Sequence, residues 1–161
     1  MKTLPPRMQD KLYHDMIFPE ETLEIRKKAR SFAERELAPV AHEIAHREEK
    51  RDSFSFGVFS KLAEEDFFRI PFPKEVGGLD LKFPVCATVV TVEELAYISN
   101  SIASVYDVHC ILAGHALMYG SDFIRQKYFE AGKERYRRED EQAIPGEVPV
   151  FSGYCHIVVT V

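Results

Sequence analysis

The stretch AHEIAH has the form H-E-x-x-H, with His42 and His46 one helical turn apart and Glu43 beside the first of them. On a helix this spacing places two imidazoles on one face, where they can bind zinc while the glutamate activates a zinc-bound water. A zinc hydrolase also needs a third protein ligand. The continuation HREEKRD lacks the glycine and histidine of one zincin branch, although Glu64 or Glu65 could serve as the distant acidic ligand of another. We keep a zinc hydrolase as a remote alternative and expect no metal site.

Two further groups of polar residues could do chemistry. Glu93 and Glu94 are adjacent carboxylates, a pairing that can supply an acid and a base. Consecutive side chains on a helix point about 100° apart, so these two do not share a proton. We interpret them as interdomain contacts or as a solvated helix edge. His109 and His115 are six residues apart, a poor spacing for shared ligation, and we interpret them as core or interface histidines. We therefore assign no catalytic residue.

Composition limits the classes of protein to consider. The chain has 161 residues, enough for one domain with a sizeable core. Its net charge of −5 is mild, without the clustered basic surface that nucleic-acid binding requires. Cys86, Cys110 and Cys155 are scattered and odd in number. They predict free thiols in a reducing compartment rather than a disulfide framework.

Neither targeting nor membrane insertion is indicated. The opening MKTLPPRMQDK has no apolar stretch and is not rich in arginine or serine, so we expect neither a signal peptide nor a transit peptide, and a cytoplasmic location. The most apolar segment, Ile102 to Tyr119, is interrupted by Asp107, His109 and His115. Because a charge at the centre of a bilayer is costly, we expect no integral membrane segment.

Helical periodicity begins at Pro19 and covers the first half of the chain. Acidic residues follow this proline, and apolar residues then recur at spacings of three and four at Ile25, Ala29, Phe32, Ala33 and Leu37. This pattern predicts an amphipathic helix. Pro39 ends that helix or starts a second one through Ile44. A third helix is predicted around 56–66, before the turn-rich loop FFRIPFPKEVGG, whose Gly77-Gly78 is a plain turn rather than a phosphate cradle.

The second half is more apolar. The segment from Pro84 is rich in β-branched residues, but Val85, Val89, Val92 and Ala96 fall at helical spacing, so we predict a buried helix. A second buried helix is predicted from a Ser101 cap to Gly120, and a short amphipathic helix over 121–132. A charge run and one or two short strands follow. The sequence thus predicts an all-α bundle of about five to six helices with an irregular or short β C-terminal tail.

Three stretches belong together by order and spacing. They are RKKARSFAERELAPVA, the loop IPFPKEVGGLDL, and VEELAYIS followed by an apolar helix and YGSDFIRQKYF. Together they resemble the N-terminal helical domain of the flavin-dependent acyl-CoA dehydrogenases. In that family the loop commonly reads P-x-E-x-G-G, which is Pro73 to Gly78 here. The resemblance covers roughly residues 18–128.

This resemblance implies an acyl-CoA dehydrogenase-like helical domain over 18–132, between an N-terminal arm at 1–17 and an atypical tail at 133–161. It implies an enzyme that binds FAD and an acyl-CoA thioester, takes the α-proton with a glutamate and passes the β-hydride to the flavin. The domain's share would be one wall of the acyl pocket, at Ala103, Ser104, Asp107 and Ile111, whose helical spacing places them on one face. An electron-transfer acceptor and a homo-oligomeric full-length enzyme are also implied.

The end of the chain departs from the family. There, a β-rich domain that opens with a phrase close to A-x-T-E-P-x-A-G-S-D follows the QKY segment, and here QKY is followed by an unrelated sequence. We expect that a frameshift, truncation or misassembled gene replaced the family sequence. We also expect this chain alone to be inactive, because it lacks the groups that bind FAD and abstract the proton. The alternative is a non-catalytic helical binding or assembly module.

Overall fold

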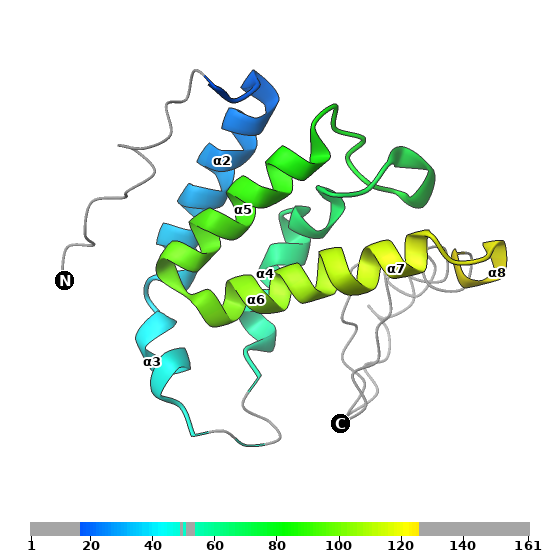
Figure 1. The fold of residues 1–161 in the computed structure, drawn as a ribbon. Helices are drawn as coiled ribbons and strands as arrows, with labels where there is room; N and C mark the ends of the chain where they lie inside the picture. The colour runs from blue at the N-terminus through cyan, green and yellow to red at the C-terminus, as the bar shows by residue number, and fades with distance from the viewer. Residues whose placement is uncertain (1–16, 49, 51–53, 126–161) are drawn as a thin grey trace.

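The structure is a computed structural model and describes residues 17–48, 50 and 54–125. These residues form helices around one core with no strand among them, which confirms the predicted all-α class. Figure 1 shows α2 and α5 side by side, with α6 and α7 running away from the end of α5. The predicted tail strands and the end of the 121–132 helix lie outside the described residues. The elements are α2 (Glu20–Phe32), α3 (Ala41–His46), α4 (Phe56–Glu64), α5 (Pro84–Ile98), α6 (Asn100–Asp107), α7 (His115–Met118) and α8 (Asp122–Arg125), with π-helical turns at Ala33–Leu37 and Val108–Gly114 and 3-10 turns at Phe67–Arg69 and Lys74–Val76.

Helix α2 follows the predicted amphipathic pattern. Pro19 is its N-cap, and Glu20 and Glu21 lie in its first turn, where the helix dipole favours negative charge. Its buried stripe includes Ala29 and Phe32 and continues into the π-helical turn through Ala33 and Leu37. The prediction placed Ile25 on the buried stripe, but Ile25 is only partly buried. Arg26, which the prediction left out, is buried on this stripe.

Helix α5 is confirmed as a helix, but only Val92 and Ala96 of the four positions that predicted it pack against the core. Val85 and Val89 are 72% and 49% exposed, whereas Val90 and Leu95 are fully buried. Nearly every position of the segment is apolar or small, so periodicity could not tell which side meets the core. The buried side carries the small residue Ala87, and α5 packs against α2.

Helix α6 starts where the chain turns at Ser99, whose backbone is extended with φ −148°. Ser99 therefore occupies the N-cap, in place of the predicted Ser101, and the two hydroxyl oxygens lie 3.1 Å apart. The helical path continues through the π-helical turn and α7. By length and composition, the run Asn100–Met118 could cross a membrane, a test that core helices of soluble proteins also pass, and 33% of its apolar window is buried.

Aromatic side chains from α2, α4 and α6, and from the 3-10 turn at Phe67–Arg69 that follows α4, fill the centre of the core. Phe32 meets Phe67 edge to face with ring centroids 5.0 Å apart. The Tyr106 hydroxyl donates a hydrogen bond to the Phe67 carbonyl oxygen at 3.0 Å. Burial raises the pKa of the Tyr106 phenol well above its ordinary value, so this group is a neutral donor. The described cysteines, Cys86 and Cys110, are free thiols, as predicted.

Candidate functional site

The four residues predicted to line an acyl pocket lie on α6 and the π-helical turn after it. Ala103 is 1% exposed and belongs to the core. Ser104 is exposed, while Asp107 and Ile111 are partly buried. The four positions thus run from the core to the surface around one side of the helix, instead of sharing a single exposure. Ser104, Asp107 and Ile111 are the members of the set that a ligand can reach in this structure.

The π-helical turn gives this helix an unusual local geometry. Such turns are rare and occur frequently at functional sites. Gly114 at its end packs against the loop, since a Cβ built there would lie 2.5 Å from the Phe72 Cζ atom. The His115 imidazole lies beside the same ring at 5.5 Å between centroids. The loop after α4 therefore braces the helix that carries the predicted wall residues.

The glycine pair of that loop has a structural task. Gly77 adopts the left-handed conformation with φ 87°, which glycine reaches without strain. A Cβ on Gly78 would lie 1.7 Å from the Phe72 carbonyl oxygen, so no side chain fits there. Asp80, with φ 56°, donates its backbone N–H to the same carbonyl oxygen at 3.2 Å. This geometry supports the interpretation of Gly77-Gly78 as a turn.

The interpretation of Glu94 as an interdomain contact or solvated helix edge is wrong. Its carboxylate is fully buried between α5 and α2. Arg26 donates to it from Nε at 3.1 Å, and Arg30 donates from Nη2 at 2.9 Å and from Nε at 3.2 Å. The adjacent Glu93 is only partly buried. A buried carboxylate is tolerated when guanidinium donors compensate for its lost hydration.

Sequence reasoning missed both arginines, although a signal was present. Arg26 and Arg30 are four residues apart, so one helix face presents both guanidinium groups. Arg26 also continues the spacing of the buried stripe through Ala29 and Ala33. A cation that is buried at such a position needs a compensating carboxylate, and here the facing helix supplies Glu94. The arrangement is a structural ion cluster and contacts none of the predicted wall residues in the hydrogen bonds described.

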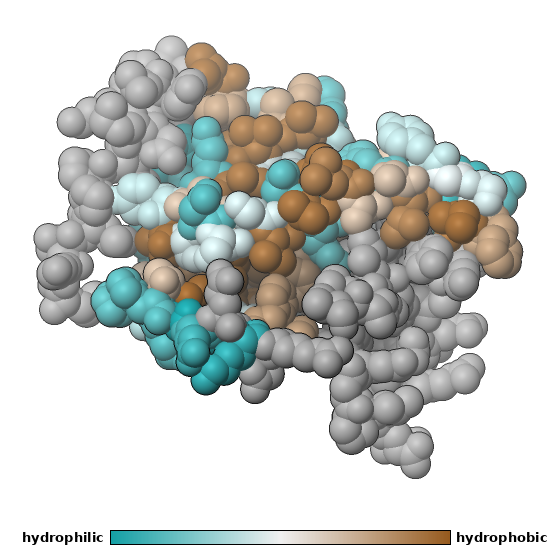
Figure 2. All heavy atoms as spheres, turned by 60° about the horizontal axis from the view of Figure 1, so that its bottom comes forward, coloured by the Kyte–Doolittle hydropathy of each residue, from teal (hydrophilic) through white to brown (hydrophobic). Residues whose placement is uncertain are grey.

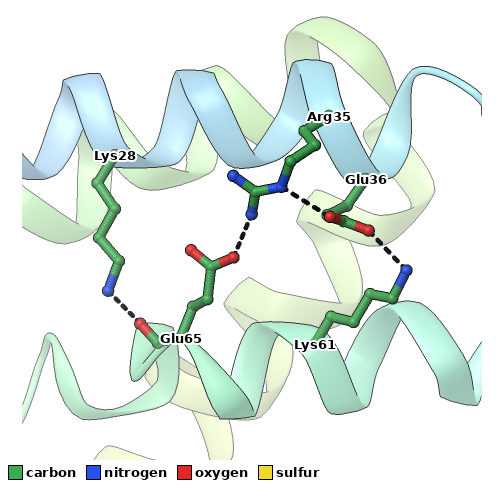
Figure 3. Close-up of polar contacts among 5 residues, drawn as sticks. All are labelled: Lys28, Arg35, Glu36, Lys61 and Glu65. Carbon is green, nitrogen blue, oxygen red and sulfur yellow. Dashed lines mark hydrogen bonds and ion pairs between the residues drawn. The ribbon is translucent and has the colours of Figure 1, made fainter.

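A second charged network lies on the surface between α2 and α4 (Figure 3). Lys61 donates to Glu36, and Arg35 donates to Glu36 at 2.7 Å and also to the Glu65 carboxylate. Lys28 donates to the backbone carbonyl oxygen of Glu65. The hydrogen bond from Lys61, followed by that from Arg35, holds the pKa of Glu36 below its ordinary value. This network joins the two helices at their exposed edge.

The H-E-x-x-H stretch forms the short exposed helix α3. The His42 and His46 rings stack with centroids 4.2 Å apart and an angle of 15° between their planes. The Arg47 guanidinium donates to the Glu43 carboxylate at 2.7 Å. Among the residues that the structure describes, no three histidine, cysteine, aspartate or glutamate side chains are grouped to hold a metal ion. The geometry supplies no third ligand for a zinc hydrolase in that part of the chain.

The two other histidines considered have different surroundings. His109 is buried, with its ring 5.0 Å from that of Phe59 and 5.3 Å from that of Phe68. This placement confirms it as a core histidine. His115 is partly buried, and its Nδ1 lies 3.3 Å from the Cys110 carbonyl oxygen. The two imidazoles therefore belong to separate environments.

Apolar side chains are exposed on α5 and along α6 to α8. They include Val85, Val89, Val108, Leu112, Tyr119 and Phe123. Figure 2 shows hydrophobic residues gathered in a broken band across the molecule and extending toward α8. Ser104 falls on the same helical stripe as Val108 and Leu112, at spacings of four. The candidate functional surface is this exposed side of α6 and the π-helical turn.

Comparison with known proteins identifies the family to which the domain is similar. The acyl-CoA dehydrogenase N-terminal domain matches residues 19–131. A 3-(aryl)acrylate reductase of Clostridium sporogenes is 33% identical over 117 residues, which cover 71% of this chain and 29% of that protein. An acyl-CoA dehydrogenase of Bacillus subtilis is 28% identical over 110 residues, covering 68% of this chain and 27% of that protein. Caffeyl-CoA reductase-Etf complex subunit CarC of Acetobacterium woodii is 33% identical over 120 residues, with coverages of 71% and 29%.

No solved structure matches the chain at the same stringency. The chain spans less than a third of the length of these curated relatives, 29% of the first and 27% of the second. The family match covers most of the chain, including α2 to α8 and the bracing loop. The chain therefore belongs to the acyl-CoA dehydrogenase family, through its N-terminal helical domain.

Proposed function

We propose that this domain supplies one wall of the acyl pocket in a flavin-dependent enzyme that interconverts acyl-CoA and enoyl-CoA thioesters. The observation that carries the proposal is the accessible side of α6 and the π-helical turn, where Ser104, Asp107 and Ile111 follow one another beside exposed Val108 and Leu112. Apolar walls with a few polar groups are typical of small-molecule sites. Names of the relatives, which include an acyl-CoA dehydrogenase and a caffeyl-CoA reductase subunit, support this substrate class.

The described residues do not fit a complete flavin site. Binding of FAD requires convergent donors for a pyrophosphate and for the isoalloxazine ring. Here the glycine pair of the loop is closed against the Phe72 backbone, and the accessible side of α6 is mainly apolar. The domain's part in the reaction is therefore to form one wall of the acyl pocket and to orient the acyl chain. We propose that flavin binding and proton abstraction require further parts of a full-length enzyme.

An activity assay tests this division of labour. Chain 1–161 is mixed with FAD, butyryl-CoA or octanoyl-CoA, and ferricenium as the electron acceptor. We expect no turnover, because the wall alone positions no base and no flavin against the substrate. Turnover that depends on chain and FAD would contradict this part of the proposal.

A chimaera tests the wall itself. Residues 19–131 replace the matching segment of the Bacillus subtilis acyl-CoA dehydrogenase, and Ile111→Phe or Ser104→Phe is then introduced. If these side chains line the pocket, the ratio of kcat/KM for octanoyl-CoA to that for butyryl-CoA falls about tenfold or more, since one methylene is worth roughly 10–200-fold. Ser31→Phe, on the exposed side of α2, is the matched control. An unchanged ratio in chimaeras that retain flavin would remove the wall assignment.

The exposed apolar band supports a second candidate, a non-catalytic binding or assembly module. Large exposed apolar patches mark interaction surfaces. In this role the chain would bind a second copy of itself through α6 to α8, without acyl-CoA. Sedimentation of chain 1–161 at several concentrations separates the cases, because self-association suppressed by Leu112→Glu supports the module. A monomer throughout would count against it.

A further inference from the structure

The exposed His42 and His46 pair on α3 has the features of a transition-metal site, apart from the acyl-pocket surface. Helix α3 is six residues long, has no buried residue and presents both imidazoles to solvent. The rings are already adjacent, with centroids 4.2 Å apart. In a tetrahedral site with metal–nitrogen bonds of about 2.1 Å, two ligand nitrogens are roughly 3.4 Å apart. Because the rings are stacked with only 15° between their planes, their nitrogen lone pairs do not converge in this arrangement, and both rings must rotate by a large angle to direct two nitrogens at one ion. Both side chains are exposed, so this rotation is open to them.

The backbone fixes which nitrogen of His46 is offered. Its Nδ1 lies 2.9 Å from the His42 carbonyl oxygen. A carbonyl oxygen only accepts, so Nδ1 carries the proton and donates it. The lone pair of the neutral ring is then on Nε2. Metal-binding histidines almost always donate their other ring N–H in this way, commonly to a backbone carbonyl, and the contact orients the ring.

The same helix argues against the hydrolase that H-E-x-x-H suggests. In a zinc hydrolase the glutamate activates a metal-bound water. Here the Glu43 carboxylate is bound by the Arg47 guanidinium at 2.7 Å, one turn further along the helix. No third ligand group accompanies the pair among the described residues. Two imidazole ligands, with water in the other coordination positions of the metal, suit Ni²⁺, Cu²⁺ or Zn²⁺. Such a site binds these ions in the order of their intrinsic affinity for nitrogen ligands.

We propose that His42 and His46 form a bidentate, non-catalytic site for a divalent transition metal, bound through the Nε2 atoms. An ion held there joins positions one turn apart and stabilises α3, because a ligand that binds the folded state shifts the folding equilibrium toward it. The site is independent of the acyl pocket wall. It requires only the helix and its two exposed imidazoles.

Calorimetry with Ni²⁺ alone tests the proposal on chain 1–161, and Ni²⁺ is chosen because it does not oxidise the free thiols. We expect His42→Gln and His46→Gln each to lose one equivalent of bound Ni²⁺ relative to the native chain. His115→Gln, at the other end of the molecule, is the matched control and should retain it. Uptake that is the same in all four proteins, or absent from the native chain, would overturn the proposal.

A second measurement locates the ion directly. In ¹H–¹⁵N spectra, substoichiometric paramagnetic Ni²⁺ should broaden the amide signals of 41–47 first, and this selective broadening should vanish in the double variant His42→Gln/His46→Gln. Circular dichroism of that variant without metal verifies that the remaining helices are formed. Broadening centred elsewhere in the chain would show that the pair is not the site.

Discussion

Replacing Glu94 by glutamine should cost this domain a large part of its stability. The carboxylate is fully buried, and the Arg26 side chain that donates to it is only 5% exposed. Glutamine keeps the shape and one acceptor oxygen but removes the negative charge, so the buried Arg26 guanidinium loses the carboxylate to which its Nε donates. Removing one partner of a buried ion pair costs about 3–5 kcal/mol. Because the Arg30 side chain is 32% exposed and keeps its water, we expect the lower end, about 3 kcal/mol.

Urea unfolding followed by circular dichroism measures this loss. With a slope of about 2 kcal/mol/M, a loss of about 3 kcal/mol lowers the unfolding midpoint by about 1.5 M. Glu93→Gln is the matched control, since its carboxylate is only partly buried and surface changes usually stay within about 0.5 kcal/mol. Equal midpoints for the two variants would refute the reasoning from burial.

A double variant separates the charge from the packing. In Arg26→Met/Glu94→Leu both buried charges are replaced by apolar side chains of similar length. Such replacements are often neutral or stabilising, so most of the midpoint lost in Glu94→Gln should return. If the double variant is less stable than Glu94→Gln, the attraction within the ion pair exceeds its desolvation cost, and the expected recovery is wrong.

Two further predictions concern the loop and the surface network. Gly78→Ala should lower the free energy of unfolding by about 4 kcal/mol or more, since its Cβ would lie 1.7 Å from the Phe72 carbonyl oxygen. Gly57→Ala has open space around it and should raise the free energy of unfolding by about 0.5 kcal/mol. Thermal unfolding measures both changes. A stable Gly78→Ala protein would contradict the close approach. The lowered pKa of Glu36, bound by Lys61, contributes stability above the unfolded-state pKa that is lost as the pH falls through the folded-state value. Glu36→Gln should therefore lose less stability between about pH 6 and about pH 3 than the native chain, and equal losses would count against the network.

The helices were predictable because their signals are local. Pro19 and the two glutamates after it mark the start of α2, and the spacing of Ala29 and Phe32 gives its buried side. The orientation of α5 was not predictable in the same way. When both sides of a helix are apolar, the side that faces the core depends on its neighbours, and Val85 therefore became exposed.

The candidate site was predictable only in part. Spacing placed Ser104, Asp107 and Ile111 on one helix, but the burial of Ala103 depends on how α6 packs against the rest of the core. The π-helical turn after Asp107 has no signature in a single sequence. Glu94 was misplaced for a related reason, because two adjacent glutamates look alike until the partners of each are known.

The ion cluster of α2 and α5 also specifies how these two helices are aligned. Its two cations are one turn apart, so the observed alignment offers Glu94 a guanidinium from Arg26 and another from Arg30. A slip of one turn in one direction would bring up Thr22 in place of the second cation. A slip in the other direction would bring up Glu34, a like charge. An apolar interface of small residues would tolerate either displacement at modest cost, whereas a buried carboxylate makes both expensive and leaves a single docking of the two helices.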